Sequence, residues 1–220
     1  MSLRVLLGLA LMLLVTGCAA SAASAPIETV TPQRIPVGTL ATETQGRPRI
    51  VLNQDVQMET YSVAGRSVDE IRDDLNKKRP FSAADNRRFD ANALWSLSWS
   101  FHFDKRPDSC SLIDATVTLV VRVQMPELAD DADRPDSVTD DWKRFLQMLE
   151  THEAGHVQHY TQAAAALQEA YRIAGAYENC DELRSVLSDV GAQQIESVRL
   201  ADVQYDQTTD HGRLQGANFP

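Results

Sequence analysis

Residues 151–156 read Thr-His-Glu-Ala-Gly-His and lie inside a long stretch of helical hydrophobic periodicity. Residues four apart on a helix share a face, so His152 and His156 can direct two imidazoles at one cation. Glu153 lies beside them, where its carboxylate can act on a water molecule. The motif interrupts the apolar face of the helix, where such groups are costly unless a partner such as a metal satisfies them. The segment predicts one zinc ion per chain, with Glu153 as catalytic base; surface His and Glu by coincidence are the alternative.

A catalytic zinc takes three protein ligands and keeps one position for water, so one ligand must come from elsewhere. Residues 205–212 read Tyr-Asp-Gln-Thr-Thr-Asp-His-Gly and follow a second helical stretch. An antiparallel return would bring them to the motif, where Asp206 would complete a site of two imidazoles and one carboxylate. His211 is the alternative ligand; if Asp206 binds the metal, His211 or Tyr205 could stabilise an oxyanion formed on the substrate. A plain helix cap ending at Gly212 is the competing interpretation.

Other imidazole and carboxylate groups fit the third position less well. His159 lies one turn beyond the motif, and a straight helix cannot bring three successive turns to one metal. We expect His159 to support the site or to lie on the surface. The remaining candidates lie higher on the second helix: Glu196 and Asp202.

The hydrophobic pattern predicts an α+β fold, in which a small antiparallel sheet with one helix precedes two long antiparallel helices that carry a zincin-like HExxH site. Residues 94–104 alternate strictly between apolar and polar, which places His102 on the exposed polar face. Residues 110–125 also alternate, and a turn at 106–108 would pair the two runs as a hairpin ended by Pro126. Shorter strands are expected at 50–52 and 57–63.

Three helices are expected. Ser67 and Glu70 form a capping-box pattern that opens a helix reaching about Lys78. A second helix, capped by Ser137 or Thr139, carries the motif and runs for about 35 residues before Gly175 closes it. The third is expected from about Asp181 to Tyr205, packed antiparallel to the second.

The N-terminus predicts export. Residues 1–17 resemble a lipoprotein signal peptide: Arg4, an apolar run too short to span a bilayer, and Val-Thr-Gly-Cys at 15–18. Cys18 would carry lipid and anchor the protein to a membrane, and residues 18–48 would form a flexible tether. By resemblance to bacterial lipoproteins, Ala19 favours the outer membrane, with the domain at 49–220 facing the periplasm. Cleavage near Ala22 or Ala25 would instead give a soluble periplasmic or secreted protein, and a retained anchor is a third alternative.

Net charge and cysteine content indicate which partners to expect and whether the chain forms a disulfide. The net charge is −10 with no basic cluster, so we expect no nucleic-acid partner. After processing at Cys18, Cys110 and Cys180 would remain, and an even pair in an oxidising compartment predicts a disulfide. Closing a loop of about 70 residues would contribute roughly 4 kcal/mol. Two buried free thiols are the alternative, and we expect a monomer.

The chain resembles the bacterial family of domain of unknown function 922, catalogued as predicted secreted zinc-dependent proteases. The features that carry the resemblance span roughly residues 55–215 and are Tyr61, Gly65, the Trp95–Phe101 strand, Cys110, the HEAGH helix and the Tyr-Asp-x-x-Thr-x-His-Gly tail at 205–212. Met-Pro-Glu at 125–127 departs from the Leu-Pro expected there. The resemblance and the motif together imply an envelope-anchored metallopeptidase that acts on peptide or protein substrates. The alternatives are a non-catalytic zinc-binding lipoprotein and an amidase for cell-wall peptide, which would share these residues.

Overall fold

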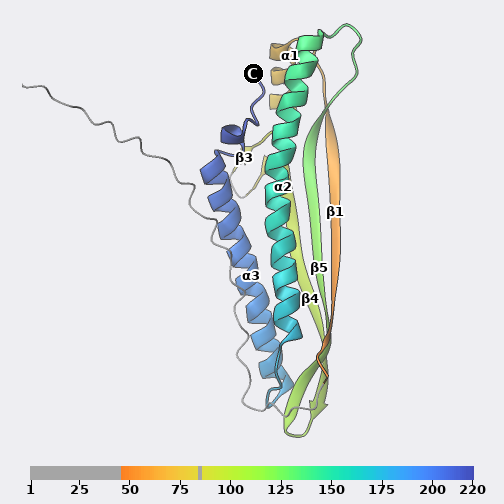
Figure 1. Ribbon diagram of the computed structural model, residues 1–220, viewed down its shortest axis with the longest axis vertical. Coiled ribbons are helices and arrows are strands. Elements are labelled where there is room, and N and C mark those ends of the chain that lie inside the picture. The colour runs from red at the N-terminus through yellow and green to blue at the C-terminus, as the bar shows by residue number, and fades with distance from the viewer. Residues whose placement is uncertain (1–45, 84–85) are drawn as a thin grey trace, which may run out of the picture. The chain divides into compact units, whose positions relative to one another are not determined.

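The computed structural model describes residues 46–83 and 86–220 (Figure 1). The predicted signal peptide, the lipidation site Cys18 and the tether up to residue 45 lie outside the described residues. The first strand begins at Arg49. Among the residues that are described, no helix combines the length and hydrophobicity needed to cross a membrane.

The fold is α+β, with a mixed three-stranded sheet in the order β1-β5-β4. β4 (Asn92–Arg106) and β5 (Ser109–Leu128) form the predicted antiparallel hairpin. β1 (Arg49–Val63) pairs with β5 in parallel, so the prediction of a purely antiparallel sheet is wrong. Two reversals of chain direction separate β1 from β5, which therefore run the same way once β5 inserts between β1 and β4.

Both ends of this sheet extend beyond the predicted strands. β1 is one continuous strand of 15 residues where two short runs were expected. β5 passes through Pro126, which pairs with Tyr61 of β1, whereas β4 begins at Asn92 opposite Gln124. Pro126 therefore has a strand neighbour on one side only, the position in a sheet where a residue without an N–H is tolerated.

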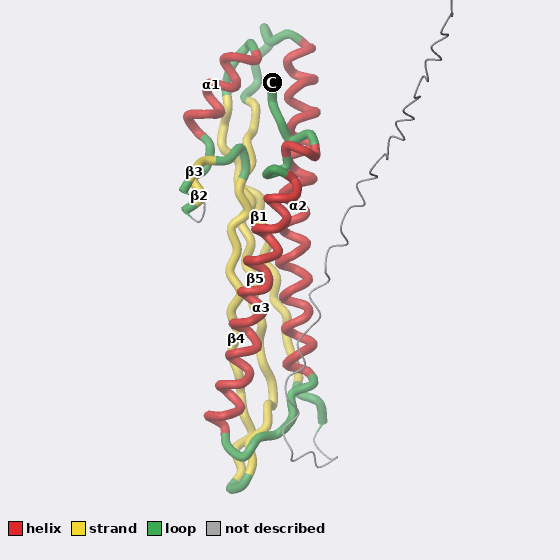
Figure 2. Tube along the Cα trace, turned by 90° about the vertical axis from the view of Figure 1, so that its left-hand side faces the viewer, coloured by secondary structure: helices red, strands yellow, loops and turns green. Residues whose placement is uncertain are grey.

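Within residues 46–83 and 86–220, three α-helices accompany the sheet. α1 (Val68–Lys78) begins as predicted, with the Glu70 amide donating to the Ser67 hydroxyl. α2 (Asp136–Arg172) follows Pro135 directly, so neither Ser137 nor Thr139 is its cap. α3 (Cys180–Thr209) continues one turn beyond the predicted end at Tyr205. α2 and α3 lie side by side along the sheet, as two views show (Figures 1 and 2).

The core forms between the sheet and the helices. Alternate residues of β5 from Ala115 to Val123 are buried, as are Phe145, Leu149 and Leu167 of α2. Cys110 and Cys180 form the predicted disulfide, with their Cα atoms 5.1 Å apart. This bond ties the start of β5 to the start of α3 and leaves the opposite end of α3 to reach the histidine motif.

A small antiparallel pair completes the fold near the start of β4. β2 (Phe81–Ser82) and β3 (Arg87–Arg88) follow α1, and residues 89–91 lead from β3 into β4. This connection faces the histidine motif across a cleft.

Candidate metal centre

Three ligand atoms from α2 and α3 converge at one point. The Nε2 atoms of His152 and His156 are 3.3 Å apart. Asp206 Oδ1 lies 3.2 Å from the first and 3.1 Å from the second. In a tetrahedral zinc site with bonds of about 2.0–2.1 Å, neighbouring ligand atoms lie about 3.3 Å apart. The triangle therefore has the dimensions of one face of a zinc tetrahedron, and its donors are of the kind that zinc prefers.

The other nitrogen of each imidazole is also engaged. His152 Nδ1 donates to Gln215 Oε1 at 2.9 Å, and His156 Nδ1 donates to Asp202 Oδ1 at 3.1 Å. Such partners fix the tautomer and orient the ring, so that Nε2 is left as the lone-pair nitrogen that a metal requires. Both histidines thus present the correct nitrogen to the same point.

The carboxylates control the charge of this cluster. Burial alone would lower the pKa of His156, but hydrogen bonds with Asp202 and Asp206 raise it to about 10. Burial would raise the pKa of Asp206, but hydrogen bonds from His152 and His156 hold it well below its usual value. Without a metal the site is therefore an ion-paired cluster, and a cation would have to displace the proton on His156.

Glu153 is the one buried group here that stands apart from the network. Its side chain is 6 % exposed, and no described residue forms a hydrogen bond with its Oε2 atom. Burial raises the pKa of Glu153 to about 7, against the opposing effect of the two histidines. A carboxyl with a pKa near neutrality, beside three metal-ligand donors, is suited to both accepting and donating a proton at physiological pH.

A turn of three residues with positive φ follows α3 and returns the chain to His152. Asp210, His211 and Gly212 have φ values of 49°, 50° and 81°. A Cβ atom on Gly212 would lie 2.9 Å from Cγ of His152, so both the backbone angle and the space favour glycine. The turn directs the short helix η1 (Arg213–Gln215) back toward α2, where Gln215 meets His152.

Tyr205 explains the glycine inside the motif. Its ring stacks on His152 at a centroid distance of 5.0 Å, and its hydroxyl accepts a hydrogen bond from Gln215 Nε2. A Cβ atom on Gly155 would lie 2.3 Å from the Tyr205 hydroxyl oxygen. Gly155 therefore allows α3 to approach α2 closely enough for Asp206, one residue further on, to reach the histidines.

The other residues considered as metal ligands either support the triangle or lie away from it. His211 Nδ1 lies 3.5 Å from Asp206 Oδ2, so it contacts the carboxylate rather than the triangle. Asp202 also accepts from His159 Nδ1 at 3.3 Å, and this second cluster shares His156 with the first. Glu196 is 61 % exposed and pairs with Arg199. His102 is exposed, as expected, and pairs with Asp114.

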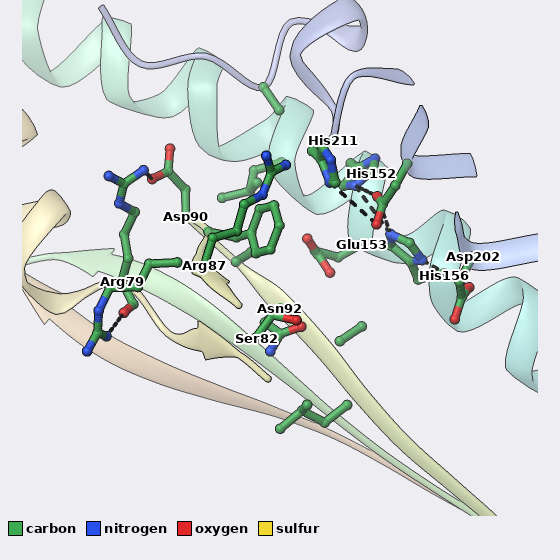
Figure 3. Close-up of a pocket in the computed structure, with 18 of the residues that line it drawn as sticks. Arg79, Ser82, Arg87, Asp90, Asn92, His152, Glu153, His156, Asp202 and His211 are labelled. Carbon is green, nitrogen blue, oxygen red and sulfur yellow. Dashed lines mark hydrogen bonds and ion pairs between the residues drawn. The ribbon is translucent and has the colours of Figure 1, made fainter. Parts of the chain in front are cut away.

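The metal-ligand triangle and Glu153 line a cleft of about 810 Å³. One side, the helix wall, comprises His152, Glu153, His156, Asp202 and Asp206 of α2 and α3. The opposite side, the strand wall, comprises residues of β2, β3, the 89–91 connection and the start of β4. Figure 3 shows Glu153 projecting from α2 into the space between the histidines and Asn92.

Sequence reasoning missed Gln215 as a partner of the site, as well as the contribution of the strand wall. Gln215 lies outside any periodic pattern, and only the turn at 210–212 brings it to His152. A run ending in His-Gly after a long helix is a weak signal of such a turn.

Comparison with known proteins places most of the described chain in one family. The model of a family described as bacterial protein of unknown function (DUF922) matches residues 58–212, which include the whole triangle. No curated protein and no solved structure matches the chain.

Proposed function

We propose that this chain, which belongs to the DUF922 family, is a zinc-dependent metallopeptidase that hydrolyses peptide bonds in the cleft beside His152, His156 and Asp206. One observation carries the proposal: three donors at tetrahedral zinc spacing line an open cleft together with Glu153, whose buried Oε2 atom has no hydrogen-bond partner among the described residues. A structural zinc site is closed by a fourth protein ligand, whereas a catalytic one keeps a position for water. The triangle borders the cleft, which favours the catalytic alternative.

Each residue has a distinct part in the reaction. The chemistry that a bound zinc ion supplies is Lewis acidity toward a carbonyl oxygen and toward water. Glu153 accepts a proton from the attacking water and delivers it to the nitrogen of the leaving amine. Asp202 and Gln215 hold the two imidazoles in place throughout. His211 contacts Asp206 and lines the cleft, and we propose that it donates a hydrogen bond to the developing oxyanion.

The start of β4 offers a place for the substrate backbone. β4 is an edge strand of the sheet that the described residues form, in which β5 is its one neighbour, and residues 92–95 line the cleft. An extended peptide can add to such an edge through main-chain hydrogen bonds. This placement would bring a peptide carbonyl between β4 and Glu153.

The proposal includes export and anchoring. The disulfide between Cys110 and Cys180 is a feature of proteins in oxidising compartments, and the N-terminal sequence supports lipidation at Cys18. We propose an outer-membrane lipoprotein that faces the periplasm. A Cys18→Ser variant should then lose incorporation of labelled palmitate and its place in the membrane fraction, whereas unchanged fractionation would contradict the anchor.

Glu153→Gln tests the peptidase proposal most directly. The amide keeps the shape of the carboxyl but cannot accept a proton, so hydrolysis of a casein or peptide-library substrate should fall by about a thousandfold or more. Zinc content, measured by plasma emission spectrometry, should stay at one ion per chain. The matched control is Glu150→Gln, an exposed residue one turn earlier on α2, which should leave turnover unchanged.

The same assays distinguish the peptidase from a non-catalytic zinc protein and test the assignment of the base. A wild-type protein that holds zinc but cleaves nothing from a broad peptide library is a non-catalytic zinc protein. Full activity in the Glu153→Gln protein would mean that another group is the base.

A further inference from the structure

The cleft is rich in arginine although the chain as a whole carries a net charge of −10. Most of these guanidinium groups have acidic partners: Arg72 and Arg79 pair with Asp90, Arg199 with Glu196, and Arg213 with Asp210. Arg88 donates to the backbone oxygen of Arg79. Arg87 is different, because within the part of the chain that the structure describes no carboxylate pairs with it.

Arg87 is exposed, but its guanidinium contacts an aromatic ring of the strand wall. Its guanidinium lies over the ring of Phe89, 4.4 Å from the centroid. Phe89 in turn lies 4.8 Å from the ring of His211, which contacts Asp206. A guanidinium stacked on an aromatic face keeps its N–H edges free for a planar, bidentate acceptor. Figure 3 shows Arg87 between Asp90 and His211, on the side of the cleft that leads to the metal centre.

We infer that Arg87 receives a carboxylate of the substrate, so that the cleft selects peptides with an acidic group close to the bond that is cleaved. This inference rests on the proposed peptidase function. The long-range field of an acidic chain repels an anionic peptide, so the preference must arise from this local contact rather than from overall charge. A bidentate pair between a guanidinium and a carboxylate supplies both the strength and the geometry for such selection.

Two sources can supply the carboxylate, namely an acidic side chain of the peptide or its free C-terminus. Three fluorescent peptides separate them: one with glutamate and an amidated C-terminus, one with glutamine at the same position and an amidated C-terminus, and one with glutamine and a free C-terminus. Tighter binding of the first peptide identifies the side chain, and tighter binding of the third identifies the terminus. Equal binding of all three peptides would overturn the inference.

The decisive measurement is binding to zinc-loaded protein that carries Glu153→Gln, in which the peptides remain intact. Adding Arg87→Gln should weaken binding of the preferred peptide about tenfold, measured by fluorescence anisotropy, and should weaken the uncharged peptide much less. Arg87→Lys should retain part of the preference, because lysine keeps the positive charge but lacks the two parallel N–H donors of a guanidinium. The matched control is Arg184→Gln: this guanidinium lies 4.8 Å from the Phe103 ring centroid, away from the cleft-lining residues, and the substitution should change neither value.

The outcomes distinguish this inference from the function on which it rests. If peptide binding depends on Arg87 but the wild-type protein cleaves nothing, the peptidase proposal fails and the carboxylate site stands. If the wild-type protein cleaves peptides and Arg87→Gln lowers kcat/KM equally for acidic and uncharged substrates, Arg87 has no selective role. Zinc content should equal one per chain in every variant, which excludes loss of the metal centre as the cause.

Discussion

The two sides of the cleft differ in how completely their polar groups are hydrogen-bonded, with Glu153 as the exception on the helix wall. On the helix wall, both nitrogens of His152 and of His156 have partners. Asp202 contacts two imidazoles and Asp206 contacts three, whereas Glu153 Oε2 has no hydrogen-bond partner among the described residues. Across the cleft, the amide nitrogen of Asn92 on the strand wall and the Nε atom of Arg79, which directly follows α1, are buried without hydrogen-bond partners in the described part of the chain.

This difference suggests a different kind of ligand for each wall. A network whose members are mutually bonded is rigid and keeps donor atoms at fixed spacing, as a resident metal ion requires. Buried donors without partners cost stability, and their retention beside a cleft is expected where a transient ligand supplies the missing acceptor. The bonded network of the helix wall therefore suits a metal ion, and under the proposed function the unpartnered atoms of Glu153 and Asn92 would meet water and substrate.

Removing a ligand from the helix wall should have the largest effect. Asp206→Ala should reduce zinc affinity by roughly a thousandfold or more, because two imidazoles alone hold the ion weakly. His211→Ala should keep the metal, since His211 meets the proposed ligand set through Asp206 Oδ2, the oxygen that does not point at the two imidazoles. Competition with a chromophoric chelator measures both affinities.

The paired substitutions also test the choice of third ligand. Loss of zinc in His211→Ala with retention in Asp206→Ala would exchange their roles. Circular dichroism of both variants in chelator should match the natural protein, which shows that the fold is intact.

Glu153 should give the metal-free protein a distinctive dependence of stability on pH. The folded state holds the Glu153 proton up to a pH of about 7, whereas the unfolded chain releases it near its ordinary value of 4.5. The folded state thus binds more protons in this window, and the contribution of Glu153 to the free energy of unfolding is lost as pH rises through it. Relative to Glu153→Gln, natural protein should lose roughly 3 kcal/mol between pH 4 and pH 8.

Urea denaturation in the presence of chelator at each pH measures this difference. Glu150→Gln is the control, and its profile should parallel that of the natural protein. A constant difference between natural and Glu153→Gln protein across the range would show that the buried carboxyl titrates normally.

Sequence patterns predicted those parts of the fold that depend on local periodicity. The alternation of residues 94–104 and the helical stripe around the HExxH motif each fixed which face is buried, and the cysteine pair indicated the disulfide. The parallel pairing of β1 with β5 was missed, because the exposure pattern of an edge strand does not depend on the direction of its neighbour.

At the site, sequence spacing indicated the two histidines but could not choose among the residues of a distant helix. The face of α3 that meets the motif depends on how closely α2 and α3 approach, which Gly155 and Tyr205 determine together. The strand wall was not predicted, because Arg87, Phe89 and Asn92 reach the cleft only through tertiary packing.

A more moderate effect is expected when the support of a ligand, rather than the ligand itself, is removed. Asp202→Asn keeps a hydrogen-bond acceptor for His156 Nδ1 but removes the negative charge. Substitutions of such supporting partners typically reduce metal affinity 10- to 100-fold, about 1.4–2.8 kcal/mol. Isothermal titration with zinc measures the change, with Asp189→Asn on the exposed face of α3 as the control. Unchanged zinc affinity in Asp202→Asn would show that metal binding does not depend on the negative charge of Asp202.

The smallest expected change in stability tests the strand wall. Asn92→Ala removes a buried amide nitrogen that bonds to none of the described residues. The free energy of unfolding should therefore change by less than about 1 kcal/mol, less than for a bonded group. If the amide donates to a substrate carbonyl, kcat/KM for peptides should nevertheless drop about tenfold while zinc content stays constant. Ser96→Ala, an exposed position further along β4, should alter neither quantity. A large loss of stability in Asn92→Ala would mean that the amide is structural, and the contrast between the two walls would then not extend to Asn92.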